Sequence, residues 1–425
     1  MTDLGWVPVL RSAVAIALVF VVCVVVHEFG HYAVAKRCGV AVPTFAIGFG
    51  PRLVRWFRGG TEFSVRLFPL GGMVQLAGEI PHDALFRRGE RIAVRIDPDG
   101  WIDAMADPAD LGEDLRAEGW LVGVLQDLDL TERWVMTIAG PDGVRTYPVR
   151  TGARLHANRR TVIPLVERSR QVIGKPLWQR ALIILAGPLM NFALAGVLFS
   201  AFYWHTGIPV NEPVLGAVAP GSPAAHAGLH QGDQVLSVDG RPVDTWMSLV
   251  ERVRADRTGK PLLLRIKRDG VVLNVTVRPR LTKQGPLLGV SYPMSYNVVR
   301  AVSTGFSTVY FGSINALGMY FQVFAHHQFN NLAGPVGIAD VISQEAQSGI
   351  WQVVMITGWL SLNLGLFNLL PFPALDGGRL LFMVAELVRG RSFDPRKEGL
   401  VHFLGFALLM LFAAVITYRD VTRLF

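Results

Sequence analysis

The stretch from residue 7 to residue 31, VPVLRSAVAIALVFVVCVVVHEFGH, ends an apolar run with two histidines and a glutamate. A helix of about twenty apolar residues is long enough to cross the hydrocarbon core of a bilayer. The run from Val7 to Val26 has this length, so it predicts a membrane-spanning helix that continues into His27, Glu28 and His31. Ionisable groups at the end of such a span are costly in lipid, and they therefore indicate a functional site.

The composition of the whole chain agrees with a membrane protein. Of its 425 residues, 51% are hydrophobic and only 17% are charged, whereas a surface that faces water needs more charge. The formal net charge is +8, but the sequence has no clustered basic helix, no Cys/His finger spacing and no alternation of aromatic and basic residues. We therefore expect no nucleic-acid partner, and we assign the basic residues to the flanks of membrane spans.

Three further apolar stretches have the length of a span, at roughly 181–204, 351–370 and 401–418. Together with the first run they predict a multi-pass α-helical membrane protein with about four transmembrane helices in the lipid bilayer. A secretory signal peptide that is cut near Ala33-Val34-Ala35 is the alternative for the first run. Cleavage there would remove the histidine motif, so we prefer the membrane span.

His27 and His31 are four residues apart, which places both imidazoles on one face of a helix, where they can hold one metal ion. Glu28 lies beside that face and can accept a proton from a water on the metal. Imidazole and carboxylate ligands with one open position favour zinc, which lowers the pKa of bound water to about 7. The alternative is a chance pattern of core histidines, and the position at the end of a span argues against it.

A catalytic zinc ion usually has three protein ligands, so a third ligand should lie at membrane depth. Residues 368–378, NLLPFPALDGG, offer Asp376 after two prolines. Pro371 and Pro373 interrupt the helix, and an interrupted backbone is tolerated in a membrane where it lines a cavity. The alternative is a kinked span end in which Asp376 caps the next helix. Because two histidines are too few, we favour Asp376 as the third ligand.

Basic residues near the span ends predict the orientation. They follow the first span, precede the second, and separate the third from the fourth: Lys36, Arg37, Arg52, Arg55, Arg58, Lys175, Arg180, Arg379, Arg389, Arg391, Arg396 and Lys397. These flanks should be cytoplasmic, so the histidine motif should lie near the cytoplasmic face. Residues from about 206 to 350 should then lie outside the cytoplasm.

The motifs HEFGH and NLLPFPALDGG, in this order, resemble those of the site-2 protease family of intramembrane zinc metalloproteases. The resemblance extends to three shorter motifs, at residues 69–74, 186–191 and 332–338, and covers almost the whole chain apart from an insert after the first motif. Residues 215–240 resemble a bacterial PDZ domain. With one such domain and the insert, the chain is similar to Gram-positive relatives of the bacterial regulator of sigma-E protease.

The resemblance implies six segments. These are a first transmembrane helix with a membrane-dipping β-hairpin at 1–79, a β-rich cytoplasmic insert at 80–173, a second transmembrane helix at 174–211, an extracytoplasmic PDZ domain at 212–281, membrane-surface helices with a linker at 282–350, and the last two transmembrane helices at 351–425. Within the insert, residues 134–149 read as a β-hairpin. For residues 297–324 a fifth span is the alternative.

The resemblance also assigns the chemistry. It makes His27, His31 and Asp376 the ligands of one Zn²⁺ ion and Glu28 the general base. The enzyme would hydrolyse peptide bonds in single-span proteins of the bacterial plasma membrane that another protease has already shortened, such as anti-sigma factors, and in signal-peptide remnants. A zinc-binding membrane transporter and a catalytically silent PDZ scaffold are the rival classes.

Further residues are implied to bind substrate. Asn363 and Asn368 match asparagines that hold the extended substrate or stabilise the transition state, with an interhelical hydrogen bond as the alternative. Gly71 and Gly72 belong to the hairpin, whose exposed edge would add the substrate as an extra strand, unless it is an ordinary cytoplasmic hairpin. We interpret Asn191 as a structural residue.

The PDZ-like segment raises a separate question. Leu215 and Gly216 would head a loop whose backbone N–H groups receive the free carboxylate of a peptide. The alternative is a domain that only excludes bulky substrates by their size.

Overall fold

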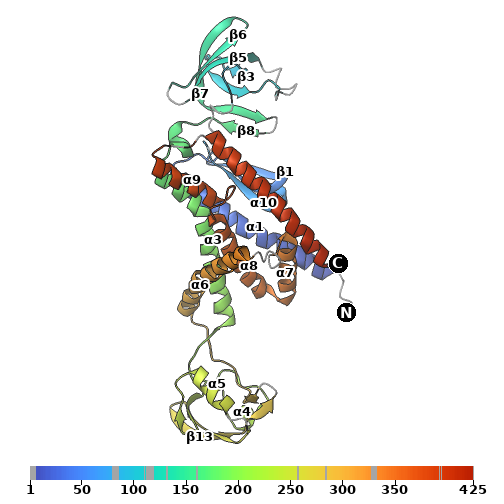
Figure 1. Ribbon diagram of the computed structural model, residues 1–425, viewed down its shortest axis with the longest axis vertical. Helices are drawn as coiled ribbons and strands as arrows, with labels where there is room; N and C mark the ends of the chain where they lie inside the picture. Colours follow the sequence, from blue (N-terminus) through green and yellow to red (C-terminus); the bar gives the residue numbers. More distant parts are fainter. Residues whose placement is uncertain are drawn as a thin grey trace. The chain divides into compact units, whose positions relative to one another are not determined.

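The computed structural model of the chain describes residues 6–78, 86–109, 111, 119–130, 133–158, 161–255, 258–282, 285–326, 333–391, 393 and 395–424. The chain forms two compact units (Figure 1). Unit 1 joins Met1–Ala195 with Val309–Phe425, and unit 2 is Gly196–Thr308. The boundary passes through two long helices, α3 (Leu177–Thr206) and α6 (Val298–Ala325).

Four helices in the described part of the chain are long and apolar enough to cross a membrane, as the sequence predicts. They are α1 (Trp6–Arg37), α3, α8 (Ile350–Leu369) and residues 397–422 of α10 (Pro395–Leu424). Only 17% of the most apolar window of α1 and 11% of that of α10 is buried in the protein, so lipid must cover the rest. The chain is therefore a multi-pass α-helical membrane protein, and α1 continues unbroken through its histidine motif.

One long helix, α6, occupies residues 298–325, where we predicted several membrane-surface helices. This helix is not among the four candidate spans, although it exposes apolar side chains such as Val299 and Phe321. Exposed apolar residues on a long helix indicate contact with lipid or with another protein. The other helical segments of unit 1 are α7 (Pro335–Ser348), α9 (Asp376–Arg389) and the short 3-10 turns η2 (Arg168–Arg170) and η3 (Val172–Gly174).

Helix α7 is held between the first and last spans. Ile342 on α7 packs in one buried cluster with Val19 on α1. At its start, the N–H groups of Gly334 and Gly337 donate to Oδ2 of Asp420 on α10, at 2.8 and 2.9 Å. The buried carboxylate thus satisfies two N–H groups that the first turn of a helix cannot pair by itself.

The predicted hairpin after α1 consists of β1 (Thr44–Arg58) and β2 (Thr61–Gln75). In its sheet, residues 44–47 pair with residues 72–75 on one side and with residues 62–65 on the other. The segment 72–75 therefore lies at an edge of this sheet, with residues 44–47 as its partner.

The insert forms a small barrel. Its strands are β3 (Arg91–Ile96), β4 (Ile102–Ala106), β5 (Trp120–Asp129), β6 (Val135–Gly140), β7 (Gly143–Asn158) and β8 (Thr161–Pro164). The sheet order is β4-β3-β5-β6-β7-β8, and an additional pairing of β4 with β7 closes it around fully buried residues such as Ile92 and Met136. The hairpin predicted at 134–149 corresponds to β6 and the first part of β7.

On the surface of the barrel, hydrogen bonds from Arg95 lower the pKa of the Asp103 carboxyl.

Unit 2 contains the PDZ-like domain. Its elements are β9 (Ile208–Pro209), α4 (Pro223–His226), β10 (Gln234–Val238), β11 (Arg241–Pro242), α5 (Trp246–Ala255), β12 (Leu262–Arg268), β13 (Val271–Val277), β14 (Arg280–Thr282), β15 (Gly285–Leu287) and β16 (Met294–Ser295). The core includes Leu264 and Leu288, and Leu288 lies beyond the predicted end of the domain at residue 281. That boundary was wrong because the segment after residue 281 completes the core.

An ion pair between a buried carboxylate and a half-buried guanidinium stabilises the PDZ-like domain. Arg268 on β12 donates to both carboxylate oxygens of Asp233 at 2.7 Å, and the Asp233 side chain is only 1% exposed. Burial alone would raise the pKa of the Asp233 carboxyl, but the hydrogen bonds from Arg268 and from the His230 backbone hold this pKa below its usual value. The carboxylate therefore stays ionised inside the domain at neutral pH.

Candidate metal centre

Three side-chain atoms from α1 and α9 converge inside unit 1. The Nε2 atoms of His27 and His31 lie 3.2 Å apart, and Oδ2 of Asp376 lies 3.2 Å from the first and 3.4 Å from the second. The two histidines are buried and Asp376 is half-buried. The structure thus brings together the three residues that the sequence predicts as ligands.

The three separations fit a metal ion. Zinc binds imidazole nitrogen and carboxylate oxygen at about 2.0–2.2 Å, and tetrahedral angles then place two ligand atoms about 3.3 Å apart. Oδ2 of Asp376 is buried and accepts no hydrogen bond from the residues that the structure describes, so a positive ion would supply the missing partner. The donor set of two imidazoles and one carboxylate leaves one position open, which is the pattern of catalytic zinc.

The interrupted helix positions Asp376. Helix α8 ends at Leu369, and α9 begins at Asp376 itself. Between them Ala374 has a left-handed backbone with φ of 79°, and its N–H donates to Nδ1 of His402 on α10 at 2.8 Å. At Gly377 a Cβ atom would lie 2.2 Å from the carbonyl oxygen of Leu370, so the tight return of the chain requires glycine. The prolines and glycines thus turn the carboxylate back toward α1.

Helix α3 supports both imidazoles from behind. Nδ1 of His31 lies 2.8 Å from the carbonyl oxygen of Ile183, and Nδ1 of His27 lies 3.2 Å from the amide nitrogen of Asn191. A Cβ on Gly187 would lie 2.3 Å from Nε2 of His31, so only glycine leaves room for the rings. Sequence reasoning found Gly187 and Asn191 only as part of a motif, because their contacts depend on how α3 packs on α1.

Glu28 lies beside the cluster and beside the edge of the hairpin. It is close enough to interact electrostatically with the histidines and with Asp376, and the backbone N–H of Val74 faces its carboxylate. A Cβ on Gly72 would lie 2.8 Å from Cγ of Glu28, so glycine allows the hairpin to approach the helix. A carboxylate next to a metal site and next to a strand edge is placed to act on an extended peptide.

Comparison with known proteins agrees with this geometry. The profile of peptidase family M50 matches residues 15–412. The chain belongs to peptidase family M50. Along 99% of its length it is 38% identical to the whole of zinc metalloprotease RasP from Geobacillus kaustophilus. Along 98% of its length it is 32% identical to regulator of sigma-W protease RasP from Bacillus subtilis, 99% of which is covered.

This M50 chain is accordingly an intramembrane zinc metalloprotease, and zinc is its cofactor. Among solved structures, the PDZ domain of an SdrC-like protein from Listeria monocytogenes is similar to 20% of the chain and is itself covered to 86%. Its sequence identity is 20% and its TM-score is 0.17.

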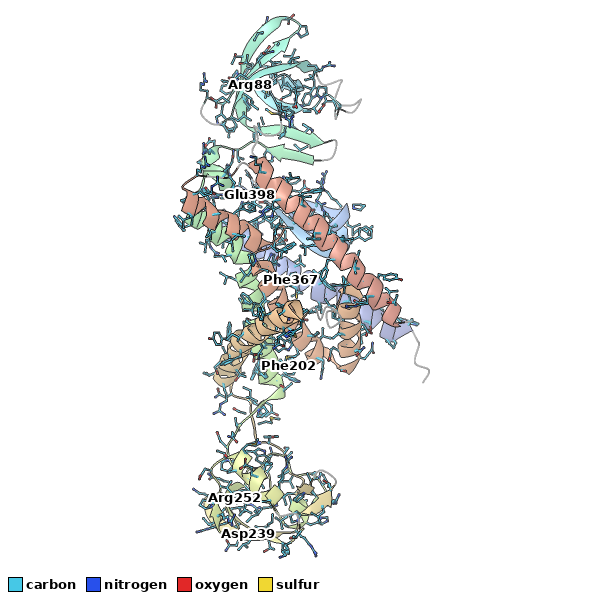
Figure 2. All side chains as sticks on the ribbon, viewed as in Figure 1. Arg88, Phe202, Asp239, Arg252, Phe367 and Glu398 are labelled. Atoms are coloured by element: carbon cyan, nitrogen blue, oxygen red, sulfur yellow. The ribbon has the colours of Figure 1, made fainter. Side chains whose placement is uncertain are left out.

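The two predicted asparagines of α8 make local hydrogen bonds in this M50 protease. Asn363 donates to the carbonyl oxygen of Trp359, and Asn368 donates to that of Leu364, each four residues earlier. Asn363 also accepts from the hydroxyl of Tyr320 on α6, whose ring contacts Phe367 edge to face. Phe367 is labelled in Figure 2. The amide of Asn363 is thus occupied on both sides, as the interhelical alternative requires.

The hairpin glycines differ from each other. Gly71 has φ of 107°, and a Cβ there would lie 2.3 Å from the ring of Phe49, so packing inside the hairpin explains this glycine. Gly72 instead faces Glu28, as described above. Of the two, Gly72 is the one that borders the candidate site.

The PDZ-like domain contains a groove, but not where Leu215 and Gly216 were expected to form it. Leu215 is buried in the core, its N–H donates to the carbonyl oxygen of Asp233, and the N–H of Gly216 donates to that of Ser291. Because internal hydrogen bonds use both N–H groups, neither is available to a peptide carboxylate. The prediction for these two residues was therefore wrong.

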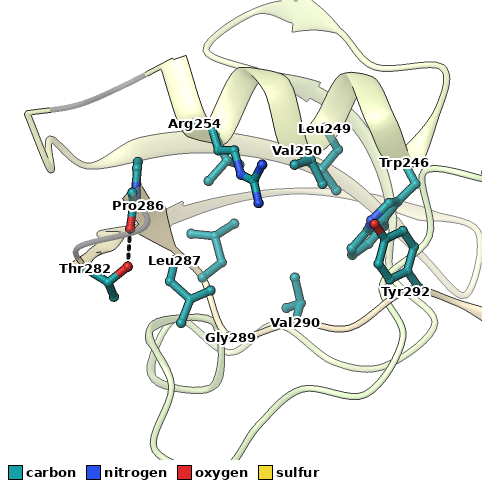
Figure 3. A pocket seen from close by; sticks show the side chains of 13 residues that line it. Trp246, Leu249, Val250, Arg254, Thr282, Pro286, Leu287, Gly289, Val290 and Tyr292 are labelled. Atoms are coloured by element: carbon teal, nitrogen blue, oxygen red, sulfur yellow. Dashed lines mark hydrogen bonds between the residues drawn. The ribbon is translucent and has the colours of Figure 1, made fainter. Parts of the chain in front are cut away.

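The groove lies between α5 and residues 285–292 (Figure 3). Its volume is about 500 Å³, and its walls include Trp246, Val250, Arg254 and Val290. On one side of this segment, the carbonyl oxygen of Gly289 accepts from the N–H of Ala219. The N–H of Ser291 donates to the carbonyl oxygen of Ala217. A second Leu-Gly pair, Leu288-Gly289, lines the groove, and it is the sequence signal that would have located the site.

Proposed function

We propose that the chain hydrolyses peptide bonds in the transmembrane segments of single-span proteins near the cytoplasmic face of the plasma membrane. The observation that carries this proposal is the set of 3.2–3.4 Å separations among His27, His31 and Asp376. Basic residues at the span ends support the orientation, because such residues stay on the cytoplasmic side. The insert would then be cytoplasmic and the PDZ-like domain extracytoplasmic.

In the proposed mechanism, His27, His31 and Asp376 hold the zinc ion, and Glu28 is the general base. Zinc, when bound, supplies a Lewis acid and lowers the pKa of a water to about 7. Glu28 accepts a proton from the attacking water and later delivers it to the leaving amine. The half-buried position of the cluster limits the access of other waters, which strengthens these electrostatic interactions.

The substrate must become extended before its peptide bonds can be attacked, because a helix hides them in its own hydrogen bonds. We propose that residues 72–75, at the sheet edge beside Glu28, pair with the unwound substrate. Asn368 would contribute a further hydrogen bond to that strand. Asn363, whose amide is occupied, would instead join α6 to α8.

For the PDZ-like domain we propose binding of an extended peptide end rather than exclusion by size alone. The groove offers apolar walls for a side chain and the Arg254 guanidinium for a carboxylate. A free carboxylate of this kind appears when another protease shortens the extracytoplasmic part of a substrate. Shortened anti-sigma factors and signal-peptide remnants have this chemistry, and they are the proposed substrates.

Cleavage of a model single-span substrate by the purified protein in detergent tests the proposal. Glu28→Gln keeps the size of the side chain and removes the base, so kcat/KM should fall about 10²–10⁴-fold. A zinc chelator should abolish cleavage by the wild type, and zinc should restore it. Equal cleavage by wild type and Glu28→Gln would overturn the assignment of the base.

The same variant separates the rival classes. A zinc-binding transporter would retain most of its transport activity after Glu28→Gln, because transport needs no general base. A silent PDZ scaffold would bind its partner equally well after zinc is removed, and neither protein would cleave the substrate.

A further inference from the structure

The amide of Asn191 on α3 lies behind the imidazole of His27, away from the ligand atom Nε2. Its nitrogen is 3.2 Å from Nδ1 of His27, its oxygen is buried without a hydrogen-bond partner in the described part of the chain, and the residue is fully buried. We propose that Asn191 is a positioning residue, which accepts the Nδ1–H of His27 and thereby aims Nε2 at the metal. This inference rests on the proposed role of His27 as a ligand.

The chemistry of imidazole fixes the direction of this hydrogen bond. A neutral histidine that binds a metal through Nε2 carries its proton on Nδ1, so Nδ1 is a donor and needs an acceptor. The nitrogen and oxygen of an asparagine amide exchange places by a half-turn of the side chain. With that half-turn, Oδ1 of Asn191 stands at 3.2 Å from Nδ1 of His27 and accepts its proton. The proton is thereby excluded from Nε2.

His31 provides the matching case on the same helix. Its Nδ1 lies 2.8 Å from the backbone carbonyl of Ile183, which can only accept a hydrogen bond. In both histidines Nε2 would then be unprotonated, with its lone pair directed toward Asp376. Such outer partners orient metal-ligating histidines and make them more basic.

Other asparagines show that this contact is not the default for the residue type. Asn363 and Asn368 turn their amides back to carbonyl oxygens of their own helix, whereas Asn191 points at a residue 164 positions away. The backbone at Asn191 is also fixed from α8, because the hydroxyl of Ser361 donates to its carbonyl oxygen at 2.9 Å. A Cβ on Gly365 would lie 3.3 Å from Cβ of Asn191, so the two helices are in close contact here. The asparagine is therefore held in place against His27.

The test uses the full-length protein in detergent and measures zinc affinity by competition with a chelator. Asn191→Leu has a similar volume but no acceptor, and it should weaken zinc binding about 10–100-fold. Asn191→Asp retains an acceptor oxygen and should bind zinc at least as tightly as the wild type. The absorption spectrum of the cobalt-substituted protein should change in Asn191→Leu and stay close to wild type in Asn191→Asp.

Ser200→Ala is the matched control, because Ser200 is also buried on α3 but donates only to the carbonyl oxygen of Gly196 in its own helix. Its zinc affinity should equal that of the wild type. Wild-type affinity in Asn191→Leu, or an equal loss in Asn191→Leu and Asn191→Asp, would overturn the inference. If Asn191→Leu does not fold, Asn191→Asp decides alone, since a loss of zinc affinity there contradicts the role as acceptor. If the wild type itself binds no zinc, the proposed function fails instead.

Discussion

The metal centre of unit 1 and the groove of unit 2 are built in opposite ways. The metal centre collects two imidazoles and two carboxylates from helices α1 and α9 that are far apart in the sequence. The groove is assembled from residues between Trp246 and Tyr292, and its walls are mostly apolar. Polar groups that are buried and aimed at one point indicate chemistry, whereas an open apolar groove with one guanidinium indicates recognition. The two functions should therefore be separable by mutation.

The largest effect should come from Asp376→Asn, which removes a ligand oxygen charge from the metal centre. Mutation of a residue that only hydrogen-bonds to a metal ligand typically lowers metal affinity by roughly 10–100-fold. Loss of a ligand charge should lower zinc affinity by more than this, and the rate of cleavage should fall with it. Peptide binding to the groove should stay unchanged. Metal analysis and peptide binding on the same sample check this, and a loss of both would show that the two regions are coupled.

The next effect concerns the stability of the PDZ-like domain. Asp233→Asn removes the charge partner of the half-buried Arg268 and weakens the hydrogen bonds between them, so the free energy of unfolding should fall. Because the folded pKa of Asp233 lies below its usual value, the stabilisation is complete above about pH 4 and disappears as the pH falls through the folded pKa.

Hydrogen exchange of the β12 amides in wild type and Asp233→Asn should therefore differ at pH 7 and converge at lower pH. Zinc affinity should be equal in the two proteins. A difference in protection that is independent of pH would contradict the role of the ion pair.

Gly187→Ala tests how tightly the metal centre is packed. The added Cβ would lie 2.3 Å from Nε2 of His31 and 2.8 Å from Cε1 of His27, so both rings must move. Zinc affinity should fall about tenfold, within the range for changes outside the ligands. Gly399→Ala on α10 is the matched control, since a Cβ there meets no atom within 4 Å. Equal zinc affinities in both variants would show that the rings of His27 and His31 can move without weakening zinc binding.

The smallest effect is expected in the groove. Val250→Asp places a charge among apolar walls and should weaken binding of a peptide with an apolar C-terminal residue about fivefold, or about 1 kcal/mol. Fluorescence anisotropy with the full-length protein measures this. Val272→Asp on β13 adds the same charge outside the groove and should have no effect. Cleavage of a substrate without an extracytoplasmic part should be unchanged in both variants.

The contrast between the two regions also explains what could be predicted from the sequence. His27, His31 and Asp376 carry chemistry that few other patterns share, so these three residues, which the structure brings together, could be proposed as ligands without knowledge of packing. The spans followed from apolar length alone. Asn191 could not be assigned in this way, because an asparagine in an apolar helix makes many kinds of hydrogen bond.

The groove was misplaced for a related reason. Leu215-Gly216 and Leu288-Gly289 are the same dipeptide, and both leucines belong to the core, so only the folded domain shows that the second pair is the one that lines the groove. Closure of the insert into a barrel by β4 and β7 could not be predicted from the sequence either, because this pairing joins strands that are not neighbours in the sequence.

The carboxylate of Asp420 at the start of α7 has a consequence for biogenesis. Helix α7 leaves the ribosome well before α10, and the N–H groups of Gly334 and Gly337 then have no acceptor from the last span. Until α10 enters the bilayer, the first turn of α7 must rely on water or on lipid headgroups. Helix α7 can pack on α1 earlier, but insertion of the final span is the step that completes the hydrogen bonds of its first turn, and a nascent chain arrested before that step would leave this turn unfinished.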